Sequence, residues 1–246
     1  MRPYNSPQMN LILFEEGELE KSLPFDDPRS IHIRQILKLE IGDEFKAGVI
    51  GGEIGKARLE GQGERAWIWS FVPICKPEPL HPLTLVLGCP RPPVARRLLK
   101  DMSTIGIKEL RCCTTDLNEK SYLTSRLWRE GLWRQALIDG GVQSGSTLLP
   151  EVRTSMSLDC SLKDLPDGAT RIALDNAPDA EPFGHHETPG DEAVLAVGPE
   201  RGWSARERSV LDAHGFVRLR LGTRILRTET ACSLGTGLLL SRMGIL

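Results

Sequence analysis

Near the C-terminal end of the chain, an unbroken apolar run is followed by a loop and by the sign of a helix start. The run, Ala193–Val197, is typical of a strand buried on both faces, and it ends at Gly198-Pro199. Ser204 and Glu207 then stand three residues apart, as the hydroxyl and carboxylate residues of a capping box do. The pattern therefore predicts a strand, a tight loop and a helix.

A second segment repeats this order of elements. Residues 217–221 alternate between apolar and polar like a strand, residues 222–227 are expected to form a loop, and Thr228 opens an apolar helix. Loops that follow neighbouring parallel strands meet at one edge of the sheet, where open α/β proteins bind their ligands. We therefore predict a single ligand crevice built from both loops.

The middle of the chain alternates strand and helix patterns. Residues 83–89 are an apolar strand, and Pro92-Pro93 suits the first turn of a helix. Residues 123–139 predict another helix, which Gly140-Gly141 ends or kinks, and residues 171–175 predict a further strand. Strands that alternate with helices indicate an α/β domain with a parallel sheet.

Two connections in this region carry less information. Residues 153–170 show little pattern, and the polar residues 179–191 are expected to form a flexible loop. His185, His186 and Glu187 lie in that loop, but adjacent histidines point in different directions and no third ligand has a workable spacing. We expect no metal site.

The N-terminal part reads as a small β domain. Apolar residues that include Ile33 and Ile36 recur at helical spacing within residues 31–39, which predicts a short helix or turn with these side chains on its inner face. Strands on either side of Gly51-Gly52 form a hairpin in which both glycines take positive φ. Residues 66–72 add a strand with Trp67 and Trp69 on one face. Short strands around glycine turns favour a small barrel.

A cluster of prolines marks the clearest domain boundary. We expect a β-barrel domain at residues 1–75, a stiff linker at 76–82, and an α/β domain at 83–246.

Apolar content of 40% with 26% charged residues is ordinary for a globular protein. Because neither a signal peptide nor a run of about 20 apolar residues is visible, we expect a cytoplasmic protein with no membrane association. The six cysteines lack a C-x-x-C pattern and are expected to be reduced and mostly buried.

Charge is uneven along the chain. The formal net charge is −2, and residues 1–75 hold nine Lys and Arg against twelve Asp and Glu. Any RNA-binding surface must therefore be a local patch. One candidate is the basic face of a helix with Arg91, Arg96, Arg97 and Lys100, which is equally explained as a solvated surface. A second candidate combines four arginines near the C-terminal loop, Arg218, Arg220, Arg224 and Arg227.

Two motifs resemble those of a known family. Gly198-Pro199-Glu200-x-Gly202, together with the segment from Leu221-Gly222 through Arg224-Ile225-Leu226-Arg227-Thr228-Glu229-Thr230-Ala231, is similar to the signatures of the RsmE family of SPOUT methyltransferases. Members methylate N3 of one uridine in small-subunit (16S) ribosomal RNA. The resemblance implies a trefoil-knotted domain that binds S-adenosylmethionine, a PUA-like N-terminal domain and a homodimer. Residues 234–240, with Gly235 and Gly237, are the candidate dimer element.

The resemblance also assigns residues to roles. The following residues are expected to line the donor site: Leu174, Gly198, Pro199, Glu200, Gly202, Leu221, Gly222, Ile225, Leu226, Thr230 and Ala231. Loss of the N3 proton leaves negative charge on the uracil, which an arginine fork can stabilise, so Arg227 or Arg224 is expected to do so. Glu229 or Glu200 is the candidate base, although a helix-capping or ion-pairing role explains either residue as well.

Three positions depart from the family pattern. Arg201 and Trp203 replace the usual Gly and Phe of the first motif, and Val142 stands where Glu is usual. Arg201 is expected to reach an RNA phosphate or to block part of the donor pocket, and it would strain the backbone if its φ were positive. These departures leave two alternatives open: a SPOUT enzyme for another RNA base, and a non-catalytic RNA-binding or ribosome-assembly protein.

Overall fold

The computed structural model describes residues 11–185 and 190–246, so His186 and Glu187 of the histidine-rich loop lie outside the described residues. The chain divides into two compact units. One comprises the residues up to Pro79 together with Ile138–Leu149, and the other comprises Leu80–Leu137 and Pro150–Leu246. The sequence did not predict that residues 138–149 belong to the first unit.

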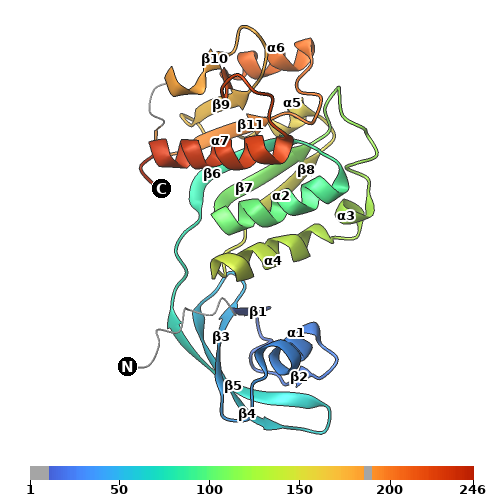
Figure 1. Cartoon of the computed structure of the whole chain (residues 1–246), viewed down its shortest axis with the longest axis vertical. Coiled ribbons are helices and arrows are strands. Elements are labelled where there is room, and N and C mark those ends of the chain that lie inside the picture. Colours follow the sequence, from blue (N-terminus) through green and yellow to red (C-terminus); the bar gives the residue numbers. More distant parts are fainter. Residues whose placement is uncertain (1–10, 186–189) are drawn as a thin grey trace. The chain divides into compact units, whose positions relative to one another are not determined.

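A five-stranded curled sheet forms the first unit (Figure 1). Its strands lie in the order β1-β3-β4-β5-β2, with β1 parallel to β3 and every other pair antiparallel. The elements are β1 (Ile12–Phe14), β2 (Leu23–Pro24), α1 (Pro28–Ile31), the π-helix η1 (His32–Leu37), β3 (Glu44–Val49), β4 (Ile54–Gln62) and β5 (Ala66–Cys75).

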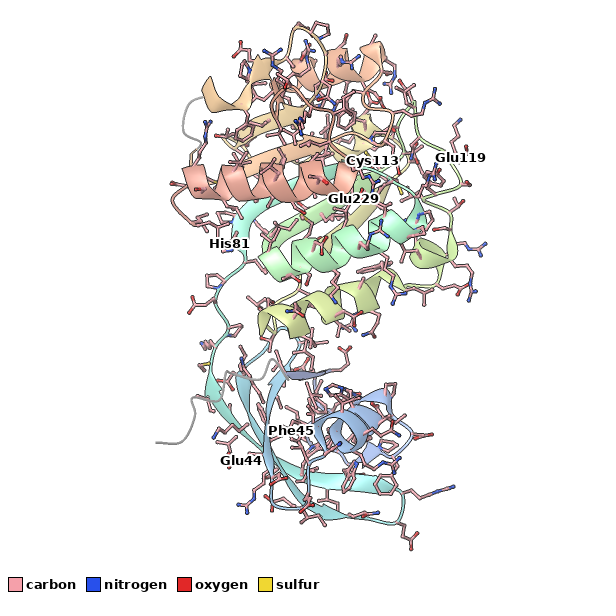
Figure 2. All side chains as sticks on the ribbon, viewed as in Figure 1. Glu44, Phe45, His81, Cys113, Glu119 and Glu229 are labelled. Carbon is pink, nitrogen blue, oxygen red and sulfur yellow. The ribbon has the colours of Figure 1, made fainter. Side chains whose placement is uncertain are left out.

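One face of this sheet is apolar and buried. In β3, Phe45 is 6% exposed whereas the preceding Glu44 is exposed, as the two-residue period of a strand requires (Figure 2). Phe14, Trp67 and Trp69 belong to the same core, which confirms the predicted tryptophan face of β5. The aromatic and aliphatic side chains therefore form a core of their own in this unit.

Two local predictions for this unit were wrong. Only Gly51 of the Gly51-Gly52 pair has a positive φ, +78°, because the connection is longer than the two-residue type I′ turn expected. Ile36 is 67% exposed, because a π-helix shifts its side chain away from the face that regular α-helical spacing assigned to it.

The second unit holds a seven-stranded, wholly parallel sheet. The strands lie in the order β10-β12-β9-β11-β6-β7-β8. Their bounds are β6 (His81–Gly88), β7 (Ile107–Cys113), β8 (Glu151–Ser155), β9 (Thr170–Leu174), β10 (Glu181–Pro182), β11 (Ala193–Val197) and β12 (Val217–Arg220). The predicted α/β class with a parallel sheet is confirmed for this unit.

Helices cover this sheet on both faces. They are α2 (Pro92–Ile105), α3 (Arg126–Arg129), α4 (Trp133–Ser144), α5 (Leu158–Ser161), the 3₁₀ turn η2 (Phe183–His185), α6 (Ala205–Ala213) and α7 (Thr228–Arg242). The first part of α4 belongs to this unit and its remainder to the other. Helices α2 and α7 pack against one another, and α7 also packs against β11 (Figure 1).

Strand β11 is central in the sheet, and all five of its residues are buried. Val194 and Ala196 join a core that includes Leu158 and Leu211, whereas Leu195 faces α7. At Gly235 of α7, a Cβ would lie 2.8 Å from Leu174 Cδ1 and 3.2 Å from Leu195 Cδ2. Gly235 therefore permits close approach of α7 to its own sheet, which corrects its expected role in dimer contact.

The helix predicted at residues 123–139 is broken. Gly131, with φ +70°, separates α3 from α4. Conversely, α4 continues through Gly140-Gly141 to Ser144. A Cβ on Gly141 would lie 2.9 Å from Leu149 Cδ2 and 3.0 Å from the Ser146 carbonyl oxygen, so a side chain has no room at this position. Gly141 therefore serves close packing, and the pair does not end the helix.

Several short elements lie where the sequence showed little pattern. Residues 153–170 contain the end of β8 and the whole of α5, and the loop expected at 179–191 contains β10 and η2. All six cysteines are free, and four of them are buried. None of the helices in the described part of the chain has the length and apolar character needed to cross a membrane.

Candidate active site

A cavity of about 730 Å³ opens at the carboxyl ends of three neighbouring strands, β9, β11 and β12. The loops that follow these strands line it, together with the start of α2, the start of α7 and one residue of α6. This is the crevice that the two loop motifs predicted, and Gly198 and Leu226 both line it. The third loop, after β9, was not predicted to take part beyond Leu174.

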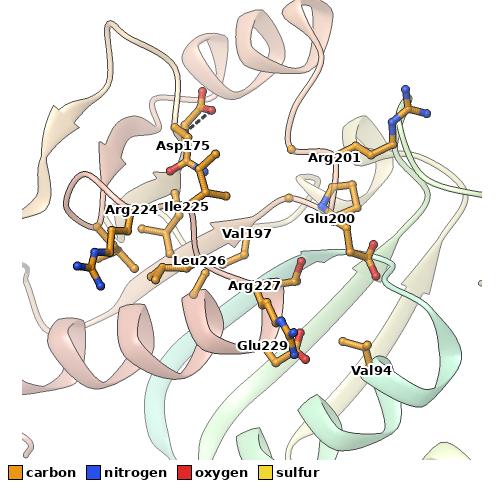
Figure 3. Close-up of a pocket in the computed structure, with 18 of the residues that line it drawn as sticks. Val94, Asp175, Val197, Glu200, Arg201, Arg224, Ile225, Leu226, Arg227 and Glu229 are labelled. Carbon is orange, nitrogen blue, oxygen red and sulfur yellow. Dashed lines mark hydrogen bonds between the residues drawn. The ribbon is translucent and has the colours of Figure 1, made fainter.

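The loop after β11 is folded tightly on itself. Gly198 and Pro199 are buried, and a Cβ on Gly198 would lie 3.1 Å from the carbonyl carbon of Gly202. Gly202, with φ +71°, takes the left-handed conformation, while Arg201 does not. Arg201 is exposed and points away from the cavity (Figure 3). The expectations that Arg201 strains the loop or blocks the pocket were therefore wrong.

Trp203 does not fill the cavity either. Its side chain is 2% exposed within the core of the second unit, and its Nε1 donates a hydrogen bond of 3.0 Å to the carbonyl oxygen of Leu174. Ser204 and Glu207 form the predicted capping box at the start of α6. Glu207 also accepts a hydrogen bond from the Asp116 N–H, so the end of this loop is tied to the loop after β7.

The loop after β12 turns at Gly222, with φ +83°, and presents its motif side chains in different directions. Ile225 is 85% exposed, which excludes the core role that an apolar residue there would ordinarily have. Arg224 points away from the cavity, whereas Arg227 and Glu229 extend from the start of α7 toward α2 (Figure 3). Arg227 is the N-cap residue of α7 and makes no capping hydrogen bond through its side chain.

Charged groups surround the mouth of the cavity. Arg97 of α2 pairs with Glu229 across a distance of 3.3 Å, and Glu200 accepts a hydrogen bond from the Arg91 N–H. Burial raises the pKa of Asp101, which lies near this pair. Glu229 lies in the first turn of α7 and is ion-paired with Arg97. This is the ion-pairing role that was expected as the alternative to a catalytic base.

A second ionic group lies at the other side of the cavity. Asp175, at the end of β9, accepts hydrogen bonds from Arg208 Nε at 2.7 Å and Arg208 Nη2 at 3.1 Å. Burial raises the pKa of Asp175, but the hydrogen bonds and charge of Arg208 outweigh it, so this pKa lies below its ordinary value of 3.8. Arg218 is held by Asp175, Asp179 and Asp212, so it is not available for the phosphate contact expected of it.

Most of the residues expected at the site line the cavity. Those that do are Leu174, Gly198, Pro199, Glu200, Gly202, Leu221, Ile225, Leu226 and Ala231, with Arg91, Arg97, Arg201, Arg224, Arg227 and Glu229. Gly222, Thr230 and Arg96 are not among the lining residues. Gly222 shapes the turn, while Thr230 and Arg96 are exposed on helices one residue away from lining residues.

Sequence reasoning missed the lining residues Val94, Asp175, Asn176, Ala177, Val197, Arg208 and Thr228. The signal available for Asp175–Ala177 was their place at the end of an apolar strand, the same reason that identified the other two loops. Arg208 had no such signal, because it reaches the cavity from the second turn of α6.

Comparison with known proteins identifies the family. The sequence model of the family described as RNA methyltransferase domain matches residues 76–240 of this chain. The ribosomal RNA small subunit methyltransferase E of Treponema pallidum is 38% identical over 232 residues, which cover 91% of this chain and 87% of that protein. This chain belongs to the RsmE family of RNA methyltransferases. A second relative, ribosomal RNA small subunit methyltransferase E 1 of Borreliella burgdorferi, is 30% identical over 91% of this chain and 94% of its own length.

Solved structures share the fold of this RsmE-family chain. The ribosomal RNA small subunit methyltransferase E of Neisseria gonorrhoeae, bound to S-adenosyl methionine, has a TM-score of 0.78 at 20% identity, covering 95% of this chain and 97% of that chain. A methyltransferase of Legionella pneumophila in complex with the same compound has a TM-score of 0.75 at 20% identity, covering 94% of this chain and 97% of that chain.

The residues of the cavity fit a nucleoside sulfonium donor. Its volume lies within the range of about 300–1,000 Å³ usual for small-molecule sites. Its lining combines apolar side chains such as Leu174, Val197 and Leu226 with the backbone of glycine-containing loops, which allows close approach of a ligand. Within residues 11–185 and 190–246, no group of three or more His, Cys, Asp or Glu is arranged to hold a metal ion.

Proposed function

We propose that this chain transfers the methyl group of S-adenosylmethionine to N3 of a uridine in small-subunit (16S) ribosomal RNA. The observation that carries the proposal is the meeting of both family motifs in one cavity, with Arg227 directed across its mouth toward α2. The names and substrates of the relatives support it. A ribosomal RNA substrate agrees with a cytoplasmic location, as do the six free cysteines.

The donor would lie among the three loops, and positioning would supply most of the catalysis. The apolar side chains of Leu174 and Leu226 would hold its adenosine, and the bound donor would supply the methyl group. Uridine N3 must lose its proton before or during attack, and the negative charge then spreads onto the neighbouring carbonyl oxygens. The Arg227 guanidinium would stabilise that charge. Glu229, once released from Arg97, would accept the proton.

RNA would approach over the exposed arginines at the mouth. Arg91, Arg97 and Arg201 line the opening, and Arg96 is exposed on the same helix, α2. Flexible exposed arginines are suited to phosphate groups, which fix the position of an RNA strand. We infer that the curled sheet of the first unit is a PUA-like domain that also binds RNA. The second unit would be the knotted SPOUT domain.

A homodimer would cover apolar side chains that one chain leaves exposed. Leu234 and Leu238 of α7 are 44% and 39% exposed, and Ile225 of the motif loop is 85% exposed. Residues 234 and 238 are one turn apart, so they lie on one face of α7. Replacing Leu238 with Asp should convert a dimer to a monomer in sedimentation velocity experiments. A wild-type protein that sediments as a monomer would contradict the dimer.

The test of the function uses small ribosomal subunits that lack the modification. Incubation with the protein and S-adenosylmethionine, followed by mass analysis of the nucleosides, should yield 3-methyluridine. Another methylated nucleoside would show that the enzyme acts on a different base. Failure to bind the donor in calorimetry at millimolar concentration would leave only the non-catalytic alternative.

A further inference from the structure

Arg208 is the arginine of the cavity whose guanidinium is held most firmly. Its side chain is 31% exposed, and it enters the cavity from α6. Two of its nitrogens, Nε and Nη2, donate to opposite oxygens of Asp175. Within the part of the chain that the structure describes, its third nitrogen, Nη1, has no hydrogen-bond partner. One edge of the guanidinium is thus fixed while a donor remains available.

Asp175 itself is not available to a ligand. Its side chain is 3% exposed, and its two oxygens also accept hydrogen bonds from the N–H groups of Asn176 and Ala177 and from Arg218. These donors and those of Arg208 fill the approximately four lone-pair sites of a carboxylate. They also compensate its negative charge, so the carboxylate does not repel an anion that binds on the other edge of Arg208.

Three other arginines of the cavity differ from Arg208. Arg97 is bound to Glu229 at the mouth, and Arg201 and Arg224 are exposed and point away from the cavity (Figure 3). A long exposed side chain loses rotamer freedom when it binds, whereas Arg208 has already lost that freedom to Asp175. Arg208 is therefore suited to a small anionic group inside the cavity, and these three arginines to a phosphate outside.

We propose that Arg208 binds the carboxylate of the amino-acid portion of the methyl donor. The proposal rests on the proposed function, because that function places S-adenosylmethionine in this cavity. The donor carries one carboxylate, at the end opposite to its adenine. A guanidinium–carboxylate hydrogen bond is of the charge-assisted kind, which is stronger than a neutral one. Asp175 acts as a positioning residue, since it orients Arg208 without touching the donor.

Calorimetry with two ligands tests the proposal. S-adenosylhomocysteine keeps the amino-acid carboxylate, and 5′-methylthioadenosine keeps the nucleoside and sulfur but lacks the carboxylate. In Arg208→Gln, affinity for S-adenosylhomocysteine should fall about tenfold or more, while affinity for 5′-methylthioadenosine should change less than about threefold. Glutamine retains N–H groups for Asp175, so the fold should be kept. Arg208→Lys, which keeps the charge, should recover part of the affinity for S-adenosylhomocysteine.

Arg206→Gln provides the matched control. Arg206 lies on the same helix and is also held by carboxylates, those of Asp116 and Asp159, but it does not line the cavity. It should leave both affinities unchanged, and thermal melting should show both variants folded. Equal losses for the two ligands in Arg208→Gln, or no loss for either, would overturn the proposal. So would unchanged affinity for S-adenosylhomocysteine with weaker binding of small ribosomal subunits, which would assign Arg208 to RNA.

The wild-type protein separates this proposal from the proposed function. Wild-type protein that binds S-adenosylhomocysteine, with an Arg208→Gln variant that binds it equally well, would refute only the role of Arg208. Wild-type protein that binds neither ligand would overturn both proposals together.

Discussion

The indole Nε1 of Trp203 donates a 3.0 Å hydrogen bond to the carbonyl oxygen of Leu174. This bond joins the loop after β11 to the end of β9, which are two of the three segments that form the cavity. A Cβ on Gly198 would lie 3.3 Å from the indole ring, so the ring also supports the first motif. Trp203 therefore stabilises, from the core, two of the segments that form the cavity.

Replacing Trp203 with Phe should weaken both stability and donor binding. The variant loses the hydrogen bond to Leu174 and leaves a void in a core where the side chain is 2% exposed. We expect the free energy of unfolding to fall by about 1–3 kcal/mol in urea denaturation. Trp67→Phe, in the other unit, should leave affinity for S-adenosylhomocysteine unchanged. Unaltered stability and affinity in Trp203→Phe would show that Trp203 does not support the cavity.

Arg227→Ala should abolish methyl transfer without unfolding the protein. Arg227 is exposed and its side chain makes no capping hydrogen bond, so its loss should leave the melting temperature nearly unchanged. Turnover with small ribosomal subunits should fall by about 100-fold or more, because the charge of the uracil anion is left uncompensated. Arg224→Ala is the matched control, since Arg224 points away from the cavity and should have a smaller effect. Full activity in Arg227→Ala would remove the assignment.

Glu229→Gln tests the proton acceptor. If Glu229 takes the N3 proton, the variant should lose about 100-fold in single-turnover rate near neutral pH, and part of that rate should return at higher pH, where hydroxide replaces the base. Arg97→Met removes the partner of Glu229 and should weaken RNA binding while donor affinity is kept. A Glu229→Gln enzyme that is less stable but equally fast would identify Glu229 as a structural ion-pair residue.

Asp175→Asn should lower stability in a pH-dependent way. The pKa of Asp175 is lower in the folded protein than its ordinary value of 3.8, so the folded state binds the proton less readily than the unfolded state. Its ionised form therefore stabilises the fold above about pH 4, and this contribution disappears as the pH falls through the folded value. Wild type should exceed the variant by about 2 kcal/mol at pH 7, and the difference should be smaller at pH 3. An equal difference at both pH values would contradict an ionic role.

Local sequence signals predicted the elements around the cavity well. The capping box of Ser204 and Glu207 fixed the start of α6, and the unbroken run of β11 indicated a strand buried on both faces, as found. Each of these signals depends only on neighbouring residues. The helix end expected at Gly140-Gly141 and the dimer contact expected of Gly235 were wrong, because a glycine that ends a helix and one that permits close packing with distant residues have the same local sequence.

The ionic groups of the site could not be predicted for the same reason. Asp175 and Arg208 are 33 residues apart, and Arg97 and Glu229 are 132 apart. Such pairs can be predicted only when the order of strands in the sheet is known. Arg201 shows the opposite case, where a substitution that looked strained is harmless because the positive φ belongs to Gly202.

The first compact unit is assembled from two stretches of chain, since Ile138–Leu149 joins the residues before Pro79. Gly51 N–H donates to the Thr147 carbonyl, and the Thr147 hydroxyl donates to the Gly52 carbonyl at 2.6 Å. An N-terminal fragment that stops at residue 79 would therefore lack part of its own hydrogen bonding. A chimera that exchanges the N-terminal domain between relatives would fold only when Ile138–Leu149 is exchanged together with the residues before Pro79.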